Sequence, residues 1–456
     1  MQAERTFNIS TLIEEQKPGR FAVGLLFWCF LIMLMDGYDQ TAVSFAAPAI
    51  IKEWHVARGG FGPVFGAGLF GTLVGSFIFG YFGDRFGRKR AIVSGSLFFG
   101  LLTLLSVWAT SLHELMLLRF IAGLGMGGVV PNSVALVAEY APKRLRATWV
   151  TLMFSGFSIG AGSGGLVSSA LIHRYGWPVM FVVGGIGSLA VACLLIVTLP
   201  ESAKLLVVRR RSVETVRKLV ARLRPELALP ADAQFVPGEV QEKKRFVLKL
   251  IFSDGLRAIT PLLWIVFIVN SMALYFLQNW VPQLTANAGL PTALAFLSGT
   301  VLNLGLWVGN ASVGWFADRF GLRRSIATYL TLGAIVLLSF SYLQSTAAIL
   351  IGLGTVGVMQ GGFLGLYAVG ARIYPAINRV TGIGWAAGVG RLGAVLGPYI
   401  AGLLVARGLG MTSTFLVFAL PLAIAAIAVA AMRAPELAAP ARVSVARTRA
   451  SEARGT

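Results

Sequence analysis

Residues 80–90 read GYFGDRFGRKR and residues 314–324 read GWFADRFGLRR, so one loop pattern occurs twice in the chain. The second copy begins 234 residues after the first. The glycine pair Gly127 and Gly128 also recurs 234 residues later, as Gly361 and Gly362. Arg146 and Thr148 recur 233 residues later, as Arg379 and Thr381. Repetition at nearly one offset predicts that two halves of the chain follow one structural plan.

The composition indicates that lipid surrounds most of the chain. Of 456 residues, 56% are hydrophobic and 13% are charged, too few polar residues for a soluble domain of this size. A membrane-spanning helix needs about 20 mostly apolar residues. Runs of that kind begin near Phe21, Gly59, Ala91, Glu114, Ala147, Trp177, Ala258, Thr292, Ser325, Ala347, Thr381 and Met411. We therefore predict an all-α integral membrane protein with twelve spans in two six-helix bundles.

The formal charge of +20 has an uneven distribution along the chain. Basic residues gather at 85–90, 143–146 and 319–324, whereas the alternate loops hold little beyond Lys52, Arg58, Arg174 and Arg407. This alternation follows the positive-inside rule and predicts that both termini lie in the cytoplasm. The basic residues do not form one face interleaved with aromatics, which argues against nucleic-acid binding.

The polar stretches divide the chain into five expected segments. These are a cytoplasmic tail (1–20), an N-terminal bundle (21–200), a cytoplasmic central loop (201–257), a C-terminal bundle (258–432) and a basic, disordered tail (433–456). Within the central loop, residues 212–223 have the spacing of an amphipathic helix at the cytoplasmic surface, either solvated or lying on the membrane. Glycines at every fourth residue, namely Gly156, Gly160 and Gly164, and Gly393 and Gly397, predict close helix packing.

Several motifs together resemble the major facilitator superfamily, whose hallmark is the loop G-x-x-x-D-R-x-G-R-[KR]; residues 80–89 fit every position. The D-G-x-D of residues 36–39, the segment PNSVALVAEYAPKRLR at 131–146 and YPAINRVTGIGWAAGVGRLGAVLGP at 374–398 narrow the resemblance to its aromatic acid:proton symporter family. The second loop departs from the hallmark at Leu322. The resemblance implies a bacterial inner-membrane carrier that imports small aromatic carboxylates with protons by alternating access. We expect a monomer, because the sequence shows no oligomerisation element.

Two aspartates are the leading candidates for proton coupling. Asp36 and Asp39 interrupt an apolar run and share one helical face at a spacing of three residues. Carboxylates inside a membrane are costly, and removal from water favours their protonated form. The alternative is that one of them caps a break at Gly37 or neutralises a structural arginine. Arg119 opens the fourth segment and matches the arginine that the resemblance links to proton transfer, with structural anchoring as its alternative; Glu139 is a further candidate.

Arg391 is the leading candidate for binding the substrate. A guanidinium inside the membrane requires an anion or a wet cavity, and a substrate carboxylate supplies one in a two-pronged geometry. The alternative is a permanent ion pair with Asp36 or Asp39. Aromatic and amide side chains offer stacking and hydrogen bonds to an aromatic ring, with ordinary packing as the alternative; they are Tyr38, Tyr275, Trp280, Trp307, Tyr367, Trp385, Gln278, Asn279, Asn303 and Gln360.

The repeated loops and the ends of neighbouring segments form a candidate gate. Charged residues there can pair with helix ends in one of two states, with fold stability and topology as the alternative role. The residues are Gly80, Asp84, Arg85, Gly87, Arg88, Arg146, Asp318, Arg319 and Arg379.

Other classes of protein remain as rivals. Within the transporters they are carriers of another organic anion, such as nicotinate or a muconate-like diacid, or of a sugar. A membrane receptor that senses aromatic acids is the rival from another class. We expect no enzyme, because there is neither a nucleophile elbow nor a metal-ligand cluster. We also expect no cofactor, because the G-x-G-x-x-G strings at Gly123, Gly352 and Gly388 follow no strand, and His55, His113 and His173 lack the spacing of metal ligands.

Overall fold

The structure is a computed structural model that describes residues 6–16, 18–209, 213–224, 227, 233–236, 251–252, 256–374 and 379–432. Parts of the predicted central loop and the whole predicted C-terminal tail lie outside the described residues. Within these described residues, twelve spans are long and apolar enough to cross a membrane, which agrees with the predicted number. Their first residues fall within about four positions of the predicted ones.

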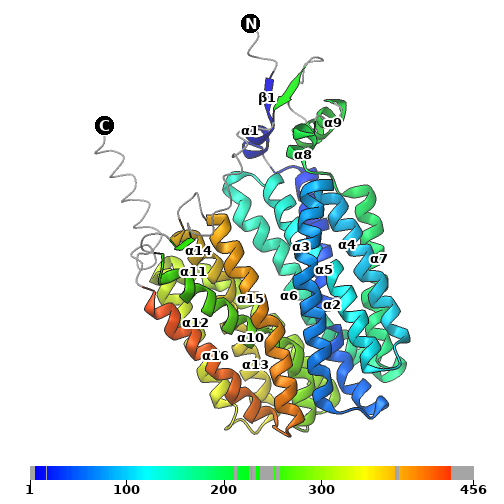
Figure 1. Cartoon of the computed structure of the whole chain (residues 1–456), viewed down its shortest axis with the longest axis vertical. Helices are drawn as coiled ribbons and strands as arrows, with labels where there is room; N and C mark the ends of the chain where they lie inside the picture. Colours follow the sequence, from blue (N-terminus) through cyan, green and yellow to red (C-terminus); the bar gives the residue numbers. More distant parts are fainter. Residues whose placement is uncertain are drawn as a thin grey trace.

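The N-terminal half contains six long helices, and the C-terminal half contains seven helices that make six spans (Figure 1). The first six are α2 (Arg20–Trp54), α3 (Phe61–Phe86), α4 (Arg88–Leu105), α5 (Leu112–Tyr140), α6 (Arg146–Tyr175) and α7 (Pro178–Thr198). The others are α10 (Ile259–Asn287), α11 (Thr292–Phe320), α12 (Leu322–Ser339), α13 (Thr346–Gln360), α14 (Gly362–Ile373), α15 (Arg379–Ala406) and α16 (Met411–Ala431). Helices α13 and α14 form one span that is interrupted at Gly361.

The internal repeat is visible in the backbone. Gly87 starts α4 with φ 116° and ψ 147°, and Gly321 starts α12 with φ 89° and ψ 145°. Positive φ values of this size favour glycine, which has no Cβ to clash with the backbone. The repeated loop therefore makes the same turn in both halves.

Glycines also allow the predicted close packing of helices. A Cβ added at Gly156 or Gly160 of α6 would strike the backbone of α2 at Phe30 or Leu34. In the other half, a Cβ at Gly393 of α15 would strike the backbone of α10 at Ile268. Small residues at this spacing let helix backbones touch, so the prediction of glycine-mediated packing is confirmed.

The two halves touch mainly at one end of the molecule. We call the end that carries Arg85, Arg88 and Lys143 the basic end, and the other the opposite end. Near the opposite end, a Cβ at Gly402 of α15 would lie 2.7 Å from the Cα of Gly62 on α3. A second contact between the halves joins α11 and α6, where the Thr300 hydroxyl donates to the Gly162 carbonyl at 2.7 Å.

The same helix faces are open toward the basic end. Phe77 and Gly80 continue the face of α3 that carries Gly62; the Phe77 side chain is 70% exposed, and a Cβ at Gly80 would meet no atom within 4 Å. On α15, Gly384 and Gly388 are open in the same way. The halves are therefore in contact at the opposite end and apart along these faces at the basic end.

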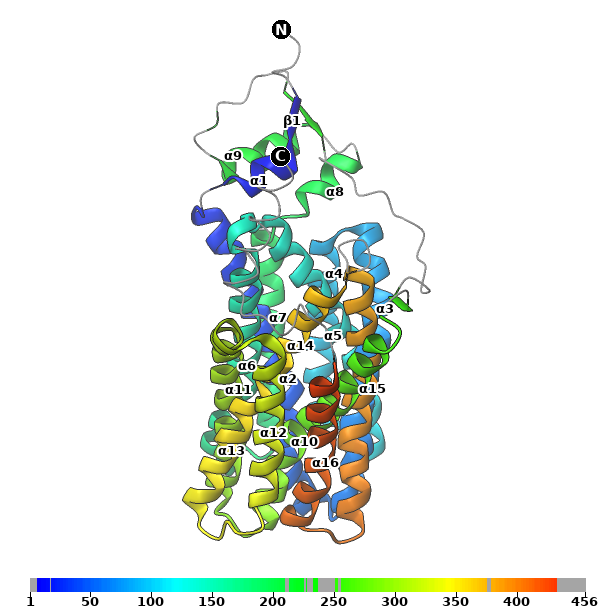
Figure 2. The ribbon, with the colours of Figure 1, turned by 90° about the vertical axis from the view of Figure 1, so that its left-hand side faces the viewer.

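A small module covers the basic end of the N-terminal half (Figures 1 and 2). It consists of β1 (Thr6–Asn8), α1 (Ile9–Glu14), α8 (Ala203–Val208), α9 (Val213–Leu223) and β2 (Gln234–Val236), and β1 pairs with β2 in parallel. The predicted amphipathic helix is α9, and its apolar side chains Val216, Leu219, Val220 and Leu223 are buried within the protein. The predicted simple N-terminal tail thus contains a strand and a helix, and the Gln16 side chain ties it to the Tyr140 carbonyl at 2.6 Å.

Candidate functional site

Asp39 and Arg119 form a buried ion pair between α2 and α5. One guanidinium nitrogen, Nη1, lies 3.3 Å from each carboxylate oxygen of Asp39. The Thr103 hydroxyl donates to Asp39 Oδ1 at 2.6 Å. Asp39 is 2% exposed and Arg119 is 5% exposed, so water outside the protein does not screen the pair.

The rest of the Arg119 guanidinium is held from α4 and α7. Its Nη2 donates to the Thr103 hydroxyl at 3.1 Å and to the Ser106 hydroxyl at 2.8 Å. The guanidinium carbon lies 5.1 Å from the centre of the Phe181 ring, within the range of a cation–π contact. Nε has no hydrogen-bond partner among the described residues. Arg119 is therefore anchored within the N-terminal half and still carries one unused donor.

Asp36 lies one turn before Asp39 on α2 and has a different environment. It is 2% exposed, and its Oδ1 has no hydrogen-bond partner in the described part of the chain. It interacts electrostatically with Asp39 and, across the boundary between the halves, with Arg391. The two predicted aspartates thus have different environments. Asp39 is paired with Arg119, whereas Asp36 is buried with one oxygen that has no partner among the described residues.

Arg391 on α15 reaches into the N-terminal half. Its Nη1 donates to the backbone carbonyl of Thr72 on α3 at 3.0 Å. Among the described residues it makes no ion pair, and the carboxylate of Asp39 is held by Arg119 instead. A partly buried cation whose hydrogen bond goes to a neutral carbonyl can accept an anion without first breaking a salt bridge.

The aromatic candidates fall into different places. Tyr275 and Tyr367 interact electrostatically with Arg391, and the ring of Tyr367 packs edge-on against Phe267 at 5.2 Å between centres. Trp307 is 41% exposed and lies on the face of α11 that carries Thr300. These three are positioned to border the space between the halves.

Three other aromatic candidates are used in packing. The Tyr38 hydroxyl donates to the Met180 carbonyl at 3.2 Å, inside the N-terminal half. Trp280 is fully buried, and its ring nitrogen donates to the Pro398 carbonyl at 2.9 Å. Trp385 stacks on Trp264 with centres 5.9 Å apart. For Tyr38 and Trp280 the structure favours the packing alternative.

The amide candidates lie on α10, α11 and α13. Gln278 donates to Asn303 at 3.0 Å, and Asn279 donates to the Tyr275 carbonyl at 2.8 Å. Gln360, at the interruption between α13 and α14, is 2% exposed, and neither end of its amide has a partner in the described part of the protein. Among the four amide candidates, Gln360 therefore has the most unused hydrogen-bonding capacity.

The gate candidates and Glu139 lie at the basic end. Arg88 pairs with Glu139 and donates to the Ser202 hydroxyl at 3.3 Å. Glu139 is 20 residues beyond Arg119 on α5, about 30 Å along the helix, which places it far from the Asp39 pair. It belongs with the gate candidates by position.

Within the described part of the chain, the remaining gate candidates contact residues of their own half. Arg85 donates to the Tyr81 hydroxyl at 2.8 Å, and Arg319 lies 5.9 Å from the Trp315 ring. Among the described residues, no ion pair links the first loop to Asp318 or Arg319. Arg146 pairs with Glu14 at 3.6 Å, and Arg379 donates to the Tyr374 carbonyl at 3.4 Å. Their role as a latch stays a prediction.

Several partners of the site were not identified from the sequence. Thr103 and Ser106 bind Arg119, and the only available signal was a pair of hydroxyl residues three positions apart in an apolar run. Thr72 contributes its backbone carbonyl, which no sequence pattern marks. Glu201 accepts from the backbone nitrogen of Lys89 at 3.2 Å and thereby joins the central loop to the repeated motif.

Comparison with known proteins gives consistent matches. The chain matches the model of the Major Facilitator Superfamily over residues 29–369 and 299–453. It is 34% identical over 427 residues to the 4-hydroxybenzoate transporter PcaK of Pseudomonas putida, covering 93% of this chain and 95% of that protein. It is also 34% identical to a gallate transporter of Pseudomonas putida, covering 89% and 90% of the two chains.

A solved structure shows the same fold. The D-xylose-proton symporter superposes with a TM-score of 0.69 at 16% identity, covering 92% of this chain and 99% of that one. At this identity the likeness concerns the fold alone. Two bundles of six spans, a repeated loop with the same glycine turn and the family match together establish that the chain is a multi-pass membrane transporter, not an enzyme, and a member of the major facilitator superfamily.

Proposed function

We propose that this transporter imports small aromatic carboxylates of the benzoate or hydroxybenzoate type together with protons across the bacterial inner membrane. The observation that carries the proposal is the environment of Arg391, a partly buried cation that donates a hydrogen bond to the neutral Thr72 carbonyl and makes no ion pair within the described part of the chain. The relatives named for 4-hydroxybenzoate and gallate transport share with this chain most of their length, and both of those compounds combine an aromatic ring with a carboxylate.

In the proposed complex, the substrate carboxylate binds the Arg391 guanidinium. Charge-assisted hydrogen bonds of this kind are about twice as strong as neutral ones, so the carboxylate displaces the Thr72 carbonyl as the preferred acceptor. Tyr275 and Tyr367, which interact electrostatically with Arg391, offer ring faces and hydroxyls to the aromatic ring. Trp307 and the unpaired amide of Gln360 are further candidates for contacts with ring substituents.

Proton coupling follows from the buried acids. Bringing an anionic substrate next to Asp36 and Asp39 is unfavourable while both carboxylates are charged, because like charges repel strongly where water is excluded. Protonation of either carboxylate reduces that repulsion. Protonation of Asp39 also loosens its ion pair with Arg119. Asp36 is one candidate, because its Oδ1 has no hydrogen-bond partner among the described residues and the carboxyl group interacts electrostatically with Arg391.

The placement of charge gives the proposed cycle its orientation in the membrane. The positive-inside rule assigns the basic end, with both termini, to the cytoplasm. The opposite end then faces the outside. Because the two halves touch at that end, the described conformation is closed toward the outside. Import then proceeds from a state in which those contacts open and the faces around Phe77 and Gly384 close, followed by a return to the described conformation.

The test is uptake of radiolabelled 4-hydroxybenzoate, gallate and benzoate into proteoliposomes of purified protein, with and without an inward proton gradient. We expect accumulation that depends on the gradient, and competition from the unlabelled acids. Uptake of an aliphatic diacid or of a sugar in preference to these acids would contradict the substrate class. Binding of the acids without accumulation would instead support a receptor.

A further inference from the structure

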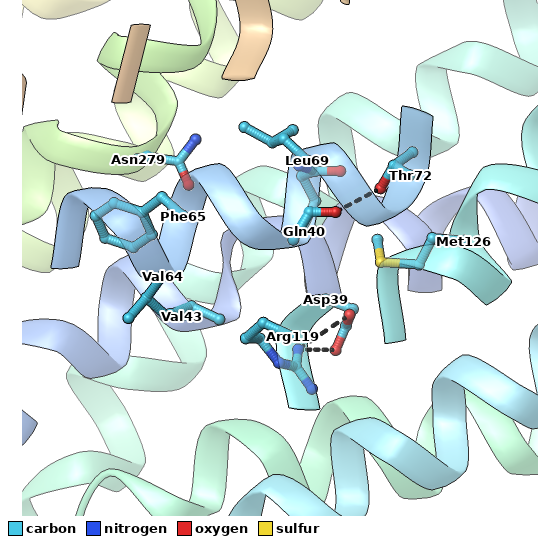
Figure 3. Close-up of a pocket in the computed structure, with 11 residues that line it drawn as sticks. Asp39, Gln40, Val43, Val64, Phe65, Leu69, Thr72, Arg119, Met126 and Asn279 are labelled. Atoms are coloured by element: carbon cyan, nitrogen blue, oxygen red, sulfur yellow. Dashed lines mark hydrogen bonds and ion pairs between the residues drawn. The ribbon is translucent and has the colours of Figure 1, made fainter. Parts of the chain in front are cut away.

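A small cavity adjoins the ion pair of Asp39 and Arg119 (Figure 3). It has a volume of about 30 Å³ and lies between α2, α3 and α5 of the N-terminal half, with Asn279 of α10 contributed by the other half. Its polar lining consists of Asp39, Gln40, Thr72, Arg119 and Asn279. The cavity therefore touches the paired acid directly and includes a residue whose carbonyl binds Arg391.

The size of the cavity excludes an aromatic acid. Sites for small organic ligands occupy about 300 Å³ or more, roughly ten times this volume. One water molecule needs about 10 to 15 Å³ by the same kind of measure, so the cavity accommodates one or two. A cavity of this size with several polar groups on its wall fits water, whereas empty cavities in proteins are lined by apolar side chains.

Arg119 also has an unmet hydrogen-bonding need. Its Nε is buried with no acceptor among the described residues, although its two other nitrogens donate to Asp39, Thr103 and Ser106. Buried donors in native proteins are nearly always paired with protein or with ordered water. This is a second observation, independent of the cavity's shape, that indicates a small acceptor beside Arg119.

As one of the two acids of the proposed coupling, Asp39 needs a partner that can exchange a proton. Its described partners are the Thr103 hydroxyl and the Arg119 guanidinium, and neither group gives up a proton at physiological pH. We propose that the cavity holds water that accepts a hydrogen bond from Arg119 and carries the proton to and from the Asp39 carboxyl group. When the proton is released, the O–H bond of the protonated Asp39 breaks and the proton passes to the water oxygen. The electron pair of that bond stays on the Asp39 oxygen, and the resulting carboxylate pairs with Arg119.

This inference rests on the proposed proton coupling and adds the carrier that delivers the proton. It is tested by filling the cavity from two helices. Val43→Ile adds one methylene from α2, and Gly68→Ala adds a methyl from α3, where the new Cβ would lie at an ordinary 3.7 Å from the Arg119 carbonyl. Val197→Ile is the matched control, because Val197 is 85% exposed on α7 and the added methylene there touches no cavity.

The first readout detects the water itself. Hydroxyl radicals produced by an X-ray pulse oxidise methionines that lie beside bound water; Met126 lines the cavity, whereas Met153 is fully buried and does not. We expect Met126 to be oxidised at least fivefold faster than Met153 in the parent protein. The Met126 rate should fall toward that of Met153 in both filled variants and stay high in Val197→Ile. Equal rates for the two methionines in the parent protein would overturn the inference.

The second readout separates this inference from the proposed function. In the filled variants we expect gradient-driven uptake of 4-hydroxybenzoate to fall about tenfold, while exchange of labelled for unlabelled acid at equal pH on both sides continues at the parent rate. A parent protein that shows no gradient-driven uptake contradicts the proposed function. A parent protein that does show it, with filled variants that match it, contradicts the role of the water.

Discussion

Nη1 of Arg119 on α5 lies 3.3 Å from both carboxylate oxygens of Asp39 on α2. The pair joins two helices of the same half, and Thr103 and Ser106 hold the other guanidinium nitrogen from a third segment. In the proposed coupling, proton binding at Asp39 removes one charge from this buried network, so the stability of the N-terminal half and the proposed coupling depend on the same contact.

Replacing one partner of this pair should therefore destabilise the protein. In Arg119→Gln, the Asp39 carboxylate remains buried without its cation, and we expect a loss of about 3 to 5 kcal/mol in unfolding free energy at neutral pH. Thermal unfolding of detergent-solubilised protein measures the effect. The double variant Asp39→Asn with Arg119→Gln should recover most of that stability while gradient-driven uptake stays abolished. Equal instability of the double variant would contradict the charge-based explanation.

Replacement of Arg391 should weaken substrate binding. Arg391→Lys keeps the positive charge but loses the planar fork that holds a carboxylate at two points. A charge-assisted hydrogen bond contributes about 1.5 to 3 kcal/mol, so we expect the dissociation constant for 4-hydroxybenzoate to rise roughly 10- to 150-fold. Calorimetric titration of the purified protein measures it. Arg407→Lys, just beyond α15 and exposed, is the matched control; an affinity loss of the same size there would contradict a specific role for Arg391.

The sequence predicted the spans, the repeat and the glycine contacts because these depend on local properties. An apolar run of about 20 residues and a glycine at positive φ are visible without knowledge of tertiary structure. The repeated motif therefore predicted similar turns in the two halves, and the structure has them at Gly87 and Gly321.

The partners within the site depend on rotation between helices, which the sequence does not contain. Asp36 and Asp39 share one face at three-residue spacing, yet that spacing turns the side chains about 60° apart around the helix. This rotation directs Asp39 to Arg119, 80 residues away, and leaves Asp36 near the second half. The pairing of β1 with β2 was also missed, because strands of three residues carry no measurable period.

Neutralising Asp84 should slow transport without changing which acid is preferred. Asp84 is exposed at the basic end in the described conformation, interacts electrostatically with Arg88 and makes no ion pair with the second half in the described part of the chain. An exposed ion pair formed in the other conformation is worth about 0.4 to 1 kcal/mol, so Asp84→Asn should reduce the initial uptake rate about two- to fivefold. Lys218→Gln on α9, exposed at the same end, is the control. A changed ranking of benzoate, 4-hydroxybenzoate and gallate would contradict a gating role.

Disturbing the contact at the opposite end should shift the balance between conformations. A Cβ at Gly402 would lie 2.7 Å from the Gly62 Cα and 2.9 Å from the Gly59 carbonyl, so Gly402→Ala forces α15 away from α3. Overpacking of this kind costs about 1 to 3 kcal/mol, which favours the state open at the opposite end by roughly 5- to 150-fold. Gly410→Ala, just before α16 at the same end, is the matched control, because a Cβ there meets no atom within 4 Å.

The shift is measurable as a distance between spin labels. With both native cysteines, Cys29 and Cys193, replaced by serine, labels at Lys52→Cys and Arg407→Cys report the separation of the two halves at the opposite end. We expect a longer distance to dominate in Gly402→Ala and the parent distribution to persist in Gly410→Ala. Because the α3–α15 contact is backbone against backbone, no side-chain rotation can relieve the added methyl group. An unchanged distribution in Gly402→Ala would therefore show that this contact does not hold the opposite end closed.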